Sequence, residues 1–180
     1  MQHWFELQAR AEVALYDRNT VEVSESLLGG FERLRKSMLY YVRPMRYAAN
    51  WVSARLWLSM ASHPDHRRPA LRNAARLAKK LRRDAAPHVD VWAQLIEAGI
   101  AFQKGNDDRA VELLERAERG ADELSLRLCA ASARWRRAAL IGGDAGEALR
   151  VQAIAWQHSE DVVNMDDMAA LVTPGFDTHD

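Results

Sequence analysis

The stretch that decides the fold is AFQKGNDDRAVELLERAERG, residues 101–120, in which an apolar helix end, a polar break and a second amphipathic run follow one another. Gly105 can adopt the left-handed backbone conformation that closes a helix. Asn106 or Asp107 can then accept a hydrogen bond from the unpaired N–H groups of the next helix. The stretch therefore predicts a hairpin of two helices, and the next question is whether the hairpin repeats.

Comparable breaks recur along the chain at similar intervals. In IGGDAGEA, Gly143 follows Gly105 by 38 residues, and earlier breaks fall around Pro64 and Arg18, at intervals of 41 and 46 residues. Self-similarity at a period of roughly 20–50 residues is the sequence signature of repeat proteins. The drifting interval predicts four degenerate copies of one helical pair.

The apolar residues between these breaks follow a helical period. One stripe with steps of four and three residues predicts a long helix over residues 21–42, and it consists of Leu27, Phe31, Leu34, Met38 and Tyr41. Within it, Gly29 and Gly30 are expected to permit close contact with a neighbouring helix. The few β-branched residues never alternate over a useful length, so strands are not predicted.

These patterns predict an all-α protein. Short loops between successive helices favour antiparallel neighbours, and helices of this length must bury their apolar stripes against one another. We expect a right-handed α-solenoid of about four helical hairpins, closed by a C-terminal capping helix near residues 162–171. Residues 1–180 are expected to form a single domain.

Composition limits the function classes. The chain has 180 residues, and its 25 Lys and Arg residues balance 25 Asp and Glu residues, so no net charge steers it toward nucleic acid or anionic lipid. The single Cys129 excludes an internal disulfide and fits a reducing compartment. The start MQHWFELQAR lacks the features of a secretory signal, and no apolar run approaches the roughly 18 residues of a membrane span. We therefore expect a cytoplasmic protein without a membrane partner.

The segment KGNDDRAVELLERA resembles the second half of a tetratricopeptide repeat. In that pattern a Gly-Asn or Gly-Asp turn is followed by an Ala, a bulky residue four positions later and an Ala three positions after that, and Ala110, Leu114 and Ala117 occupy these places. The related segment GGDAGEALRVQAIA departs at Gln152, where a bulky apolar residue belongs. The resemblance implies stacked helical hairpins.

Almost the whole chain is similar to the tetratricopeptide-like C-terminal region of large bacterial serine/threonine protein kinases. The segments that carry this likeness are HWFELQARAEVALYDRN, LRNAARLAKKLRRDAAPHVDVWAQLIEAGIAFQKGNDDRAVELLERAE, LCAASARWRRAALIGGDAGEAL and DDMAALVTPGF. The resemblance implies an interaction or regulatory scaffold. The chain contains no Gly-rich phosphate loop, His-Arg-Asp catalytic loop or Asp-Phe-Gly motif, so we expect neither enzymatic activity nor a cofactor.

Other reactive residues are better explained without a catalytic or metal site. His63 and His66 have a spacing that metal ligands can use, but they lie in a predicted turn without a second ligand cluster. Cys129 falls on an apolar helix side and is expected to pack in the core. Four acids near the last helix are explained by favourable charge at a helix start; they are Glu160, Asp161, Asp166 and Asp167.

The strongest charged feature is the basic helix over residues 67–83. Its cations at helical spacing are expected on one exposed face, and they are Arg72, Arg76, Lys79, Lys80 and Arg83. The opposite, buried face is predicted to consist of Leu71, Ala74, Ala75, Ala78 and Leu81. Such a face can bind phosphate groups of nucleic acid, bind an acidic protein or domain, or be offset by nearby Asp and Glu. No aromatic residues interleave on it to stack with bases.

The favoured function is protein–protein interaction through a concave groove formed by the first helix of each pair. The predicted groove residues are Glu12, Arg55, Leu95, Phe102 and Arg137. In a kinase context, this groove would dock the kinase domain, its substrate or a regulator. The alternative is a helical module of a nucleic-acid-associated or transcriptional regulator that uses the basic helix 67–83.

Overall fold

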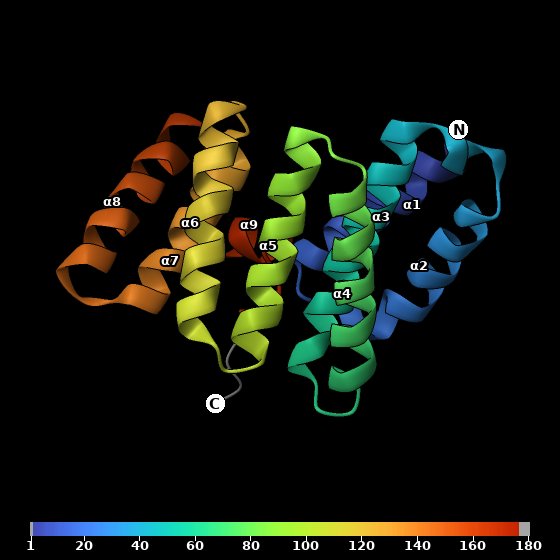
Figure 1. Cartoon of the computed structure of the whole chain (residues 1–180), viewed down its shortest axis with the longest axis horizontal. Coiled ribbons are helices and arrows are strands. Elements are labelled where there is room, and N and C mark those ends of the chain that lie inside the picture. The colour runs from blue at the N-terminus through green and yellow to red at the C-terminus, as the bar shows by residue number, and fades with distance from the viewer. Residues whose placement is uncertain (1, 177–180) are drawn as a thin grey trace.

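The computed structural model describes residues 2–176, and all regular secondary structure in this part of the chain is helical (Figure 1). The helices, in chain order, are α1 (Gln2–Tyr16), α2 (Thr20–Arg35), η1 (Met38–Tyr41), α3 (Arg43–Ser59), η2 (Met60–Ser62), α4 (Arg67–Arg83), α5 (Pro87–Gln103), α6 (Asp107–Glu123), α7 (Arg127–Ile141), α8 (Gly143–Ser159) and α9 (Met165–Val172). The all-α prediction is confirmed for these residues.

The four breaks in the sequence fall in four turns, each between the two members of a helix pair. Arg18 joins α1 to α2, Pro64 joins α3 to α4, Gly105 joins α5 to α6, and Gly143 begins α8 directly after α7. Gly105 and Gly143 have φ angles of 73° and 56°, in the left-handed region that glycine tolerates. Asn106 accepts a hydrogen bond from the Arg109 backbone N–H at 3.1 Å, as expected of an N-cap residue.

The first eight α-helices pack mainly against their neighbours in sequence, with further contacts from α1 to α3 and from α3 to α5. Figure 1 shows the result as a row of upright helices, with α1 and α2 at one end and α8 at the other. Apolar side chains lie between consecutive helices, and Phe31, Leu56, Leu77 and Leu114 are among the fully buried ones. Each helix is thus stabilised by the next one in the row.

The predicted helix over residues 21–42 is wrong in its C-terminal third. Helix α2 ends at Arg35, because Ser37 adopts an extended conformation and its hydroxyl donates a hydrogen bond to the Leu34 carbonyl at 2.7 Å. The short η1 follows, and it leaves Met38 and Tyr41 exposed by 86% and 83%. The prediction that Gly30 permits close contact is consistent with the structure, where a Cβ at this position would lie 2.7 Å from Leu7 Cδ1.

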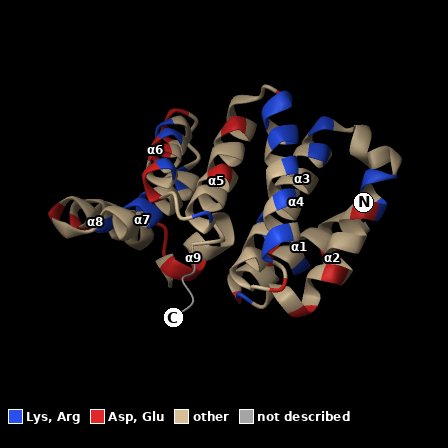
Figure 2. Cartoon of the chain, turned by 60° about the horizontal axis from the view of Figure 1, so that its bottom comes forward, with Lys and Arg blue, Asp and Glu red and all other residues tan. Residues whose placement is uncertain are grey.

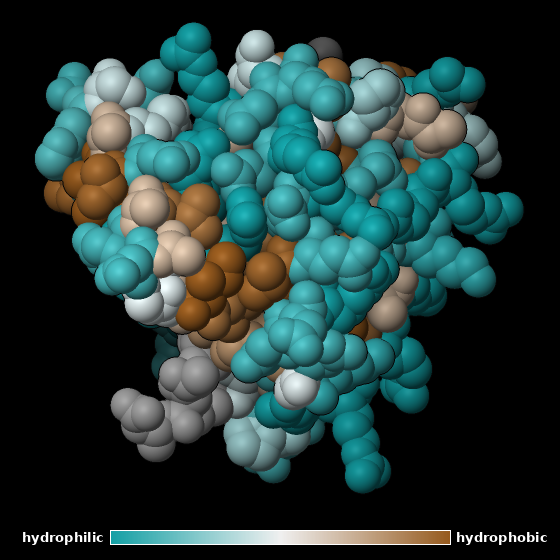
Figure 3. Space-filling model, turned by 60° about the vertical axis from the view of Figure 1, so that its left-hand side comes forward, coloured by the Kyte–Doolittle hydropathy of each residue, from teal (hydrophilic) through white to brown (hydrophobic). Residues whose placement is uncertain are grey.

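The last helix does not cap the row. Helix α9 contacts α7 and α1 and has only minor contact with α8, and Figure 1 shows it in the middle of the molecule, behind α5. The outer side of α8 carries Val151, which is 58% exposed. On this side of the molecule apolar areas lie among hydrophilic ones (Figure 3). The expected capping helix therefore lies against the inside of the row.

Across residues 2–176, none of the helices combines the length and apolar character that a membrane crossing requires.

Candidate functional site

We call residues 164–176, the last described part of the chain, the C-terminal segment. It lies across the side of the row that α1, α3, α5 and α7 form, and we call this side the inner face. Asn164 begins it by accepting hydrogen bonds from the backbone N–H groups of Asp166 and Asp167, at 2.9 and 3.4 Å. The segment then buries Met165 and Ala169 against α7, in a cluster that Trp135 and Trp156 partly cover. It is therefore held by packing as well as by polar contacts.

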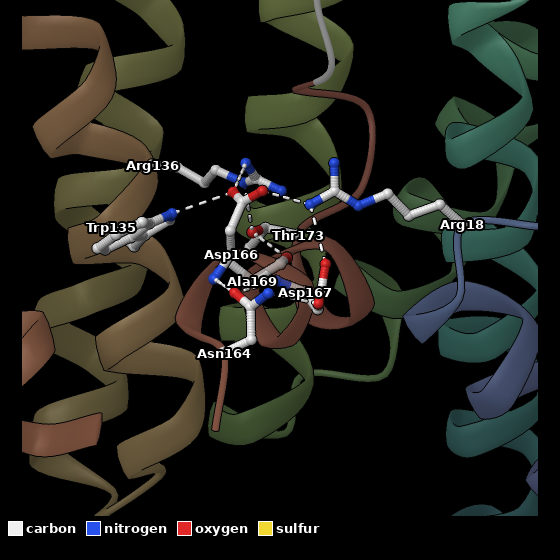
Figure 4. A network of polar contacts seen from close by, with 8 residues as sticks. All are labelled: Arg18, Trp135, Arg136, Asn164, Asp166, Asp167, Ala169 and Thr173. Carbon is white, nitrogen blue, oxygen red and sulfur yellow. Dashed lines mark hydrogen bonds and ion pairs between the residues drawn. The ribbon is translucent and has the colours of Figure 1, made fainter. Parts of the chain in front are cut away.

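The acidic first turn of α9 lies between cations of the α1–α2 turn and of α7 (Figure 4). Arg18, in the α1–α2 turn, pairs with Asp166 and, at 3.2 Å, with Asp167. From α7, Arg136 Nη1 lies 3.3 Å from Asp166 Oδ1, and Trp135 Nε1 donates to the same oxygen at 3.2 Å. This one turn thus connects the N-terminal hairpin to α7.

These contacts shift the titration of Asp166. Partial burial opposes ionisation, but hydrogen bonds from Arg18 and Trp135 and the charge of Arg136 outweigh it, so the pKa of Asp166 lies below its ordinary value. The carboxylate is consequently the form that the site stabilises.

Arg55 of α3 is the second anchor, and its side chain is only 3% exposed. Its guanidinium forms a bidentate pair with Glu12 of α1, at 2.8 and 2.6 Å, and donates to the Leu171 carbonyl at 3.0 Å. It also lies over the Trp51 ring, 4.6 Å from the centroid. One buried cation thereby joins α1, α3 and the C-terminal segment.

The end of the segment packs on α5. Gln103 Nε2 donates to the Gly175 carbonyl at 2.8 Å, and Phe102 stacks on Phe176 with the ring centroids 5.1 Å apart. Gly99 makes room for this approach, since a Cβ there would lie 2.8 Å from the Pro174 carbonyl oxygen. Helix α5 therefore recognises mainly the backbone and one aromatic ring.

Three of the five predicted groove residues meet at this inner face. Arg55 and Phe102 contact the C-terminal segment, and Glu12 orients Arg55. Leu95 instead lies fully buried in the core, and Arg137 pairs with Glu118 of α6. The inner face is thus not an open groove, because the chain's own residues occupy it.

Sequence reasoning missed the other residues of this face, above all Arg136 and Arg18. Arg136 directly precedes the predicted Arg137, and a step of one residue turns a side chain by about 100° around a helix. The acids of α9 were noticed, yet only as charges at a helix start. The basic pair Arg136–Arg137 was the signal for Arg136, whereas nothing local connects Arg18 to residues about 150 positions away.

The basic face of α4 lies outside this arrangement. All five predicted cations are exposed. The buried face differs from the prediction, since Ala70 and Leu77 are fully buried, Leu71 is half-buried and Ala75 is exposed. Another α4 cation, Arg82, pairs with Asp90 and Glu97 of α5 at 2.7 and 2.6 Å. Among the described residues, no acid pairs with the five predicted cations, which are Arg72, Arg76, Lys79, Lys80 and Arg83.

Features that could support catalysis, metal binding or small-molecule binding do not form a site at the inner face. Burial raises the pKa of the Cys129 thiol to about 11, against smaller opposing effects of Arg55 and Trp92, so this thiol is a poor nucleophile. No group of three metal-ligating side chains occurs in the described part of the chain. Two surface cavities, of about 490 and 370 Å³, lie along the α1–α2 hairpin rather than at the inner face.

Comparisons with known proteins add no relative. No family profile matches the chain, and neither the curated proteins nor the solved structures include a match.

Proposed function

We propose that this protein is a protein-interaction scaffold whose inner face binds a helical segment with an acidic first turn. The observation that carries the proposal is the position of the C-terminal segment, whose Asp166 and Asp167 lie between cations of the α1–α2 turn and α7. The chain's own segment is the resident occupant, and a partner with the same pattern replaces it. This is the helix-in-groove mode of peptide recognition.

The contacts of the C-terminal segment support its exchange for a partner segment. Arg55 and Gln103 donate to main-chain carbonyls of the segment, which any polypeptide of suitable shape presents. The connection from α8 is short and exposed, with Val163 exposed by 91%. The segment also buries Met165, Ala169 and Val172, so a partner that replaces it must present apolar side chains at the same places.

The proposal also includes the type of helical architecture and the cellular role of the protein. The sequence-adjacent packing and the four turns within helix pairs support a right-handed α-solenoid of tetratricopeptide-like hairpins. The resemblance of the sequence supports an accessory role beside a bacterial serine/threonine kinase, with the kinase domain or its substrate as partner. The single Cys129 supports a cytoplasmic setting.

A competition experiment tests the proposal. A labelled peptide of sequence NMDDMAALVTPGF, corresponding to residues 164–176, is titrated into the full chain and into the variant Asp166→Asn/Asp167→Asn. The variant weakens only the resident segment, so we expect it to bind the peptide about tenfold more tightly, because the binding-competent fraction rises. Fluorescence anisotropy measures both affinities.

Two controls make the result specific. A peptide with Asn in place of both Asp residues should bind the variant at least about fivefold more weakly than the acidic peptide, because it lacks the charge-assisted bonds. Adding Arg18→Glu to the variant should weaken the acidic peptide and leave the Asn peptide unchanged. Absence of peptide binding to both chains, or equal affinity for both peptides, would refute the proposal.

A further inference from the structure

We propose a second interaction surface, which binds a short acidic protein segment that carries an apolar residue. The surface, called here the basic surface, consists of the exposed cations of α4 with Arg35 and Lys36 at the end of α2, and it is flanked by Met38 and Tyr41. It is separate from the inner face, so the failure of one proposal leaves the other standing.

The charge of this region is strongly one-sided. Residues 33–83 hold fourteen of the 25 Lys and Arg residues and one acid, Asp65. Helix α4 alone has eight cations and no acid, and Figure 2 shows them along its length. The zero net charge of the chain hides this segregation. Of the alternatives that the sequence left open, an offset by nearby acids applies to part of this set: Arg35, Arg46, Arg55 and Arg82 pair with acids outside this range. The five predicted α4 cations form no such pair among the described residues.

The cations converge instead of spreading apart. Arg35 donates to Glu32 at 2.6 Å, and its Nε and Nη2 atoms are buried without a hydrogen-bond partner. Lys80 has a lowered pKa, first because of partial burial and then because of the charges of Arg35 and Arg76, which together outweigh the opposing charge of Glu32. Helices α2 and α4 therefore hold several cations around the single acid Glu32, and a bound anion would relieve the repulsion that remains.

Exposed apolar side chains lie at the same end of the surface. Arg46 in the first turn of α3 pairs with Asp84, directly after α4, at 3.0 Å. This contact places the C-terminal end of α4 beside the segment 38–42, which bears the exposed Met38 and Tyr41. The combination of cations with exposed large apolar side chains fits a partner segment that is both acidic and apolar.

The dimensions favour a short peptide over nucleic acid. Arg72 and Arg83 are eleven residues apart, or about 17 Å along a helix, which an extended peptide spans with about five or six residues. Beyond α4 the surface becomes acidic, since α5 carries Asp90 and Glu97 and α6 has seven acids against three cations. A long polyanion would meet these acids, whereas a short acidic run stays on the cations.

The test uses the full chain and a defined probe. The first probe, called the Trp-Leu probe, is a fluorescein-labelled peptide of six alternating Asp and Glu residues followed by Gly-Trp-Leu. The second, called the Ser-Ser probe, has the same acidic run followed by Gly-Ser-Ser. We expect saturable binding of the first probe at 50 mM salt that weakens steeply at 200 mM salt. Arg76→Glu/Lys80→Glu should weaken binding at least tenfold, and the neutral Arg76→Gln/Lys80→Gln about threefold.

Matched variants separate this surface from general charge effects. Lys104→Glu/Arg119→Glu reverses two exposed cations on other elements with the same change in net charge, and it should alter affinity by less than twofold. Met38→Ser/Tyr41→Ser should weaken the Trp-Leu probe about threefold and leave the Ser-Ser probe unchanged. Circular dichroism verifies that each variant is folded.

The outcomes are decisive in both directions. The expected pattern of losses supports the proposal. Failure of the first probe to bind, or equal losses in the α4 variant and its matched control, overturns it. Tighter binding of a 12-nucleotide single strand or a 12-base-pair duplex than of the peptide, with the same sensitivity to Arg76→Glu/Lys80→Glu, would replace it with nucleic-acid recognition.

Discussion

The inner face and the basic surface use the same residue types in opposite ways. On the inner face, Arg18, Arg55 and Arg136 each contact a carboxylate, and two of these cations bind the C-terminal segment through α9 acids. On the basic surface, Arg72, Arg76 and other α4 cations lack an acid partner among the described residues. The chain thus satisfies one set of cations internally and leaves the other set for solvent or a partner.

This difference separates stability from binding. A buried cation with a paired carboxylate is costly to remove, because its partner remains without compensation. Exposed cations contribute little to stability and exert their effect on other charged molecules. Substitutions on the inner face should therefore lower stability, whereas substitutions on the basic surface should weaken binding and change stability little.

The largest effect is expected for Arg55→Met. The substitution leaves Glu12 and the Leu171 carbonyl without their donor, and we expect the free energy of unfolding to fall by about 3 kcal/mol. Urea denaturation measures it. The control Arg72→Met, on the basic surface, should change it by less than about 0.5 kcal/mol. Equal losses in the two variants would contradict the distinction between the surfaces.

A pair of glycines gives the next largest contrast. In Gly99→Ala the new Cβ would lie 2.6 Å from Leu58 Cδ2 and 2.8 Å from the Pro174 oxygen, so we expect a loss of about 1–3 kcal/mol. In Gly29→Ala only Arg33 Nη1 lies near, at 3.8 Å, and the helix should gain up to about 1 kcal/mol. Thermal unfolding measures both, and a stabilising Gly99→Ala would show that the segment does not pack there.

Acid should weaken the inner face through Asp166. Its pKa is lower in the folded chain than its ordinary value of 3.8, so its contribution is complete above that value and disappears as pH falls through the folded pKa. The carboxylate is partly exposed, which limits the effect to about 1 kcal/mol or less. Wild type should be more stable than Asp166→Asn at pH 7, and the difference should vanish in strong acid. A difference that is independent of pH would contradict this assignment.

The smallest contrast compares two arginines of α4. Arg82→Gln removes a bidentate pair with Glu97 and a contact to Asp90, so a loss of about 0.5 kcal/mol is expected. Arg76→Gln removes repulsion with Lys80 and an attraction to Glu32, so stability should change by no more than a few tenths of a kcal/mol. Both differences should shrink when salt is added during urea unfolding. A larger loss of stability in Arg76→Gln would reveal a contact on the basic surface that the structure lacks.

Local sequence signals predicted the helical class and the four turns, because glycine, proline and cap residues act over a few positions. These local signals failed where the contacting residues are far apart in the sequence. Nothing in the eight-residue α9 indicates that Asp166 meets Arg18 across 148 residues, so its helix was expected at the end of the row. The end of α2 was missed because the apolar stripe runs on through Met38, while the Ser37 hydroxyl competes for a helix carbonyl.

The cations of the basic surface also show that local sequence signals do not reveal contacts between distant parts of the chain. The α4 stripe was visible because its members repeat along one helix, but Arg35 joins it from α2 only through the fold. The count of charges over residues 33–83 was the signal that could have exposed the whole region.

The central claim is that the C-terminal segment is a detachable occupant of the inner face, and native-state hydrogen exchange tests it most directly. We expect the amides of residues 168–173 to be protected in the wild-type chain. Their opening free energy should lie below that of α3 and fall further in Asp166→Asn/Asp167→Asn while α3 is unchanged. Exchange of these amides at the rate of an unfolded peptide, or opening only together with α3, would contradict the account.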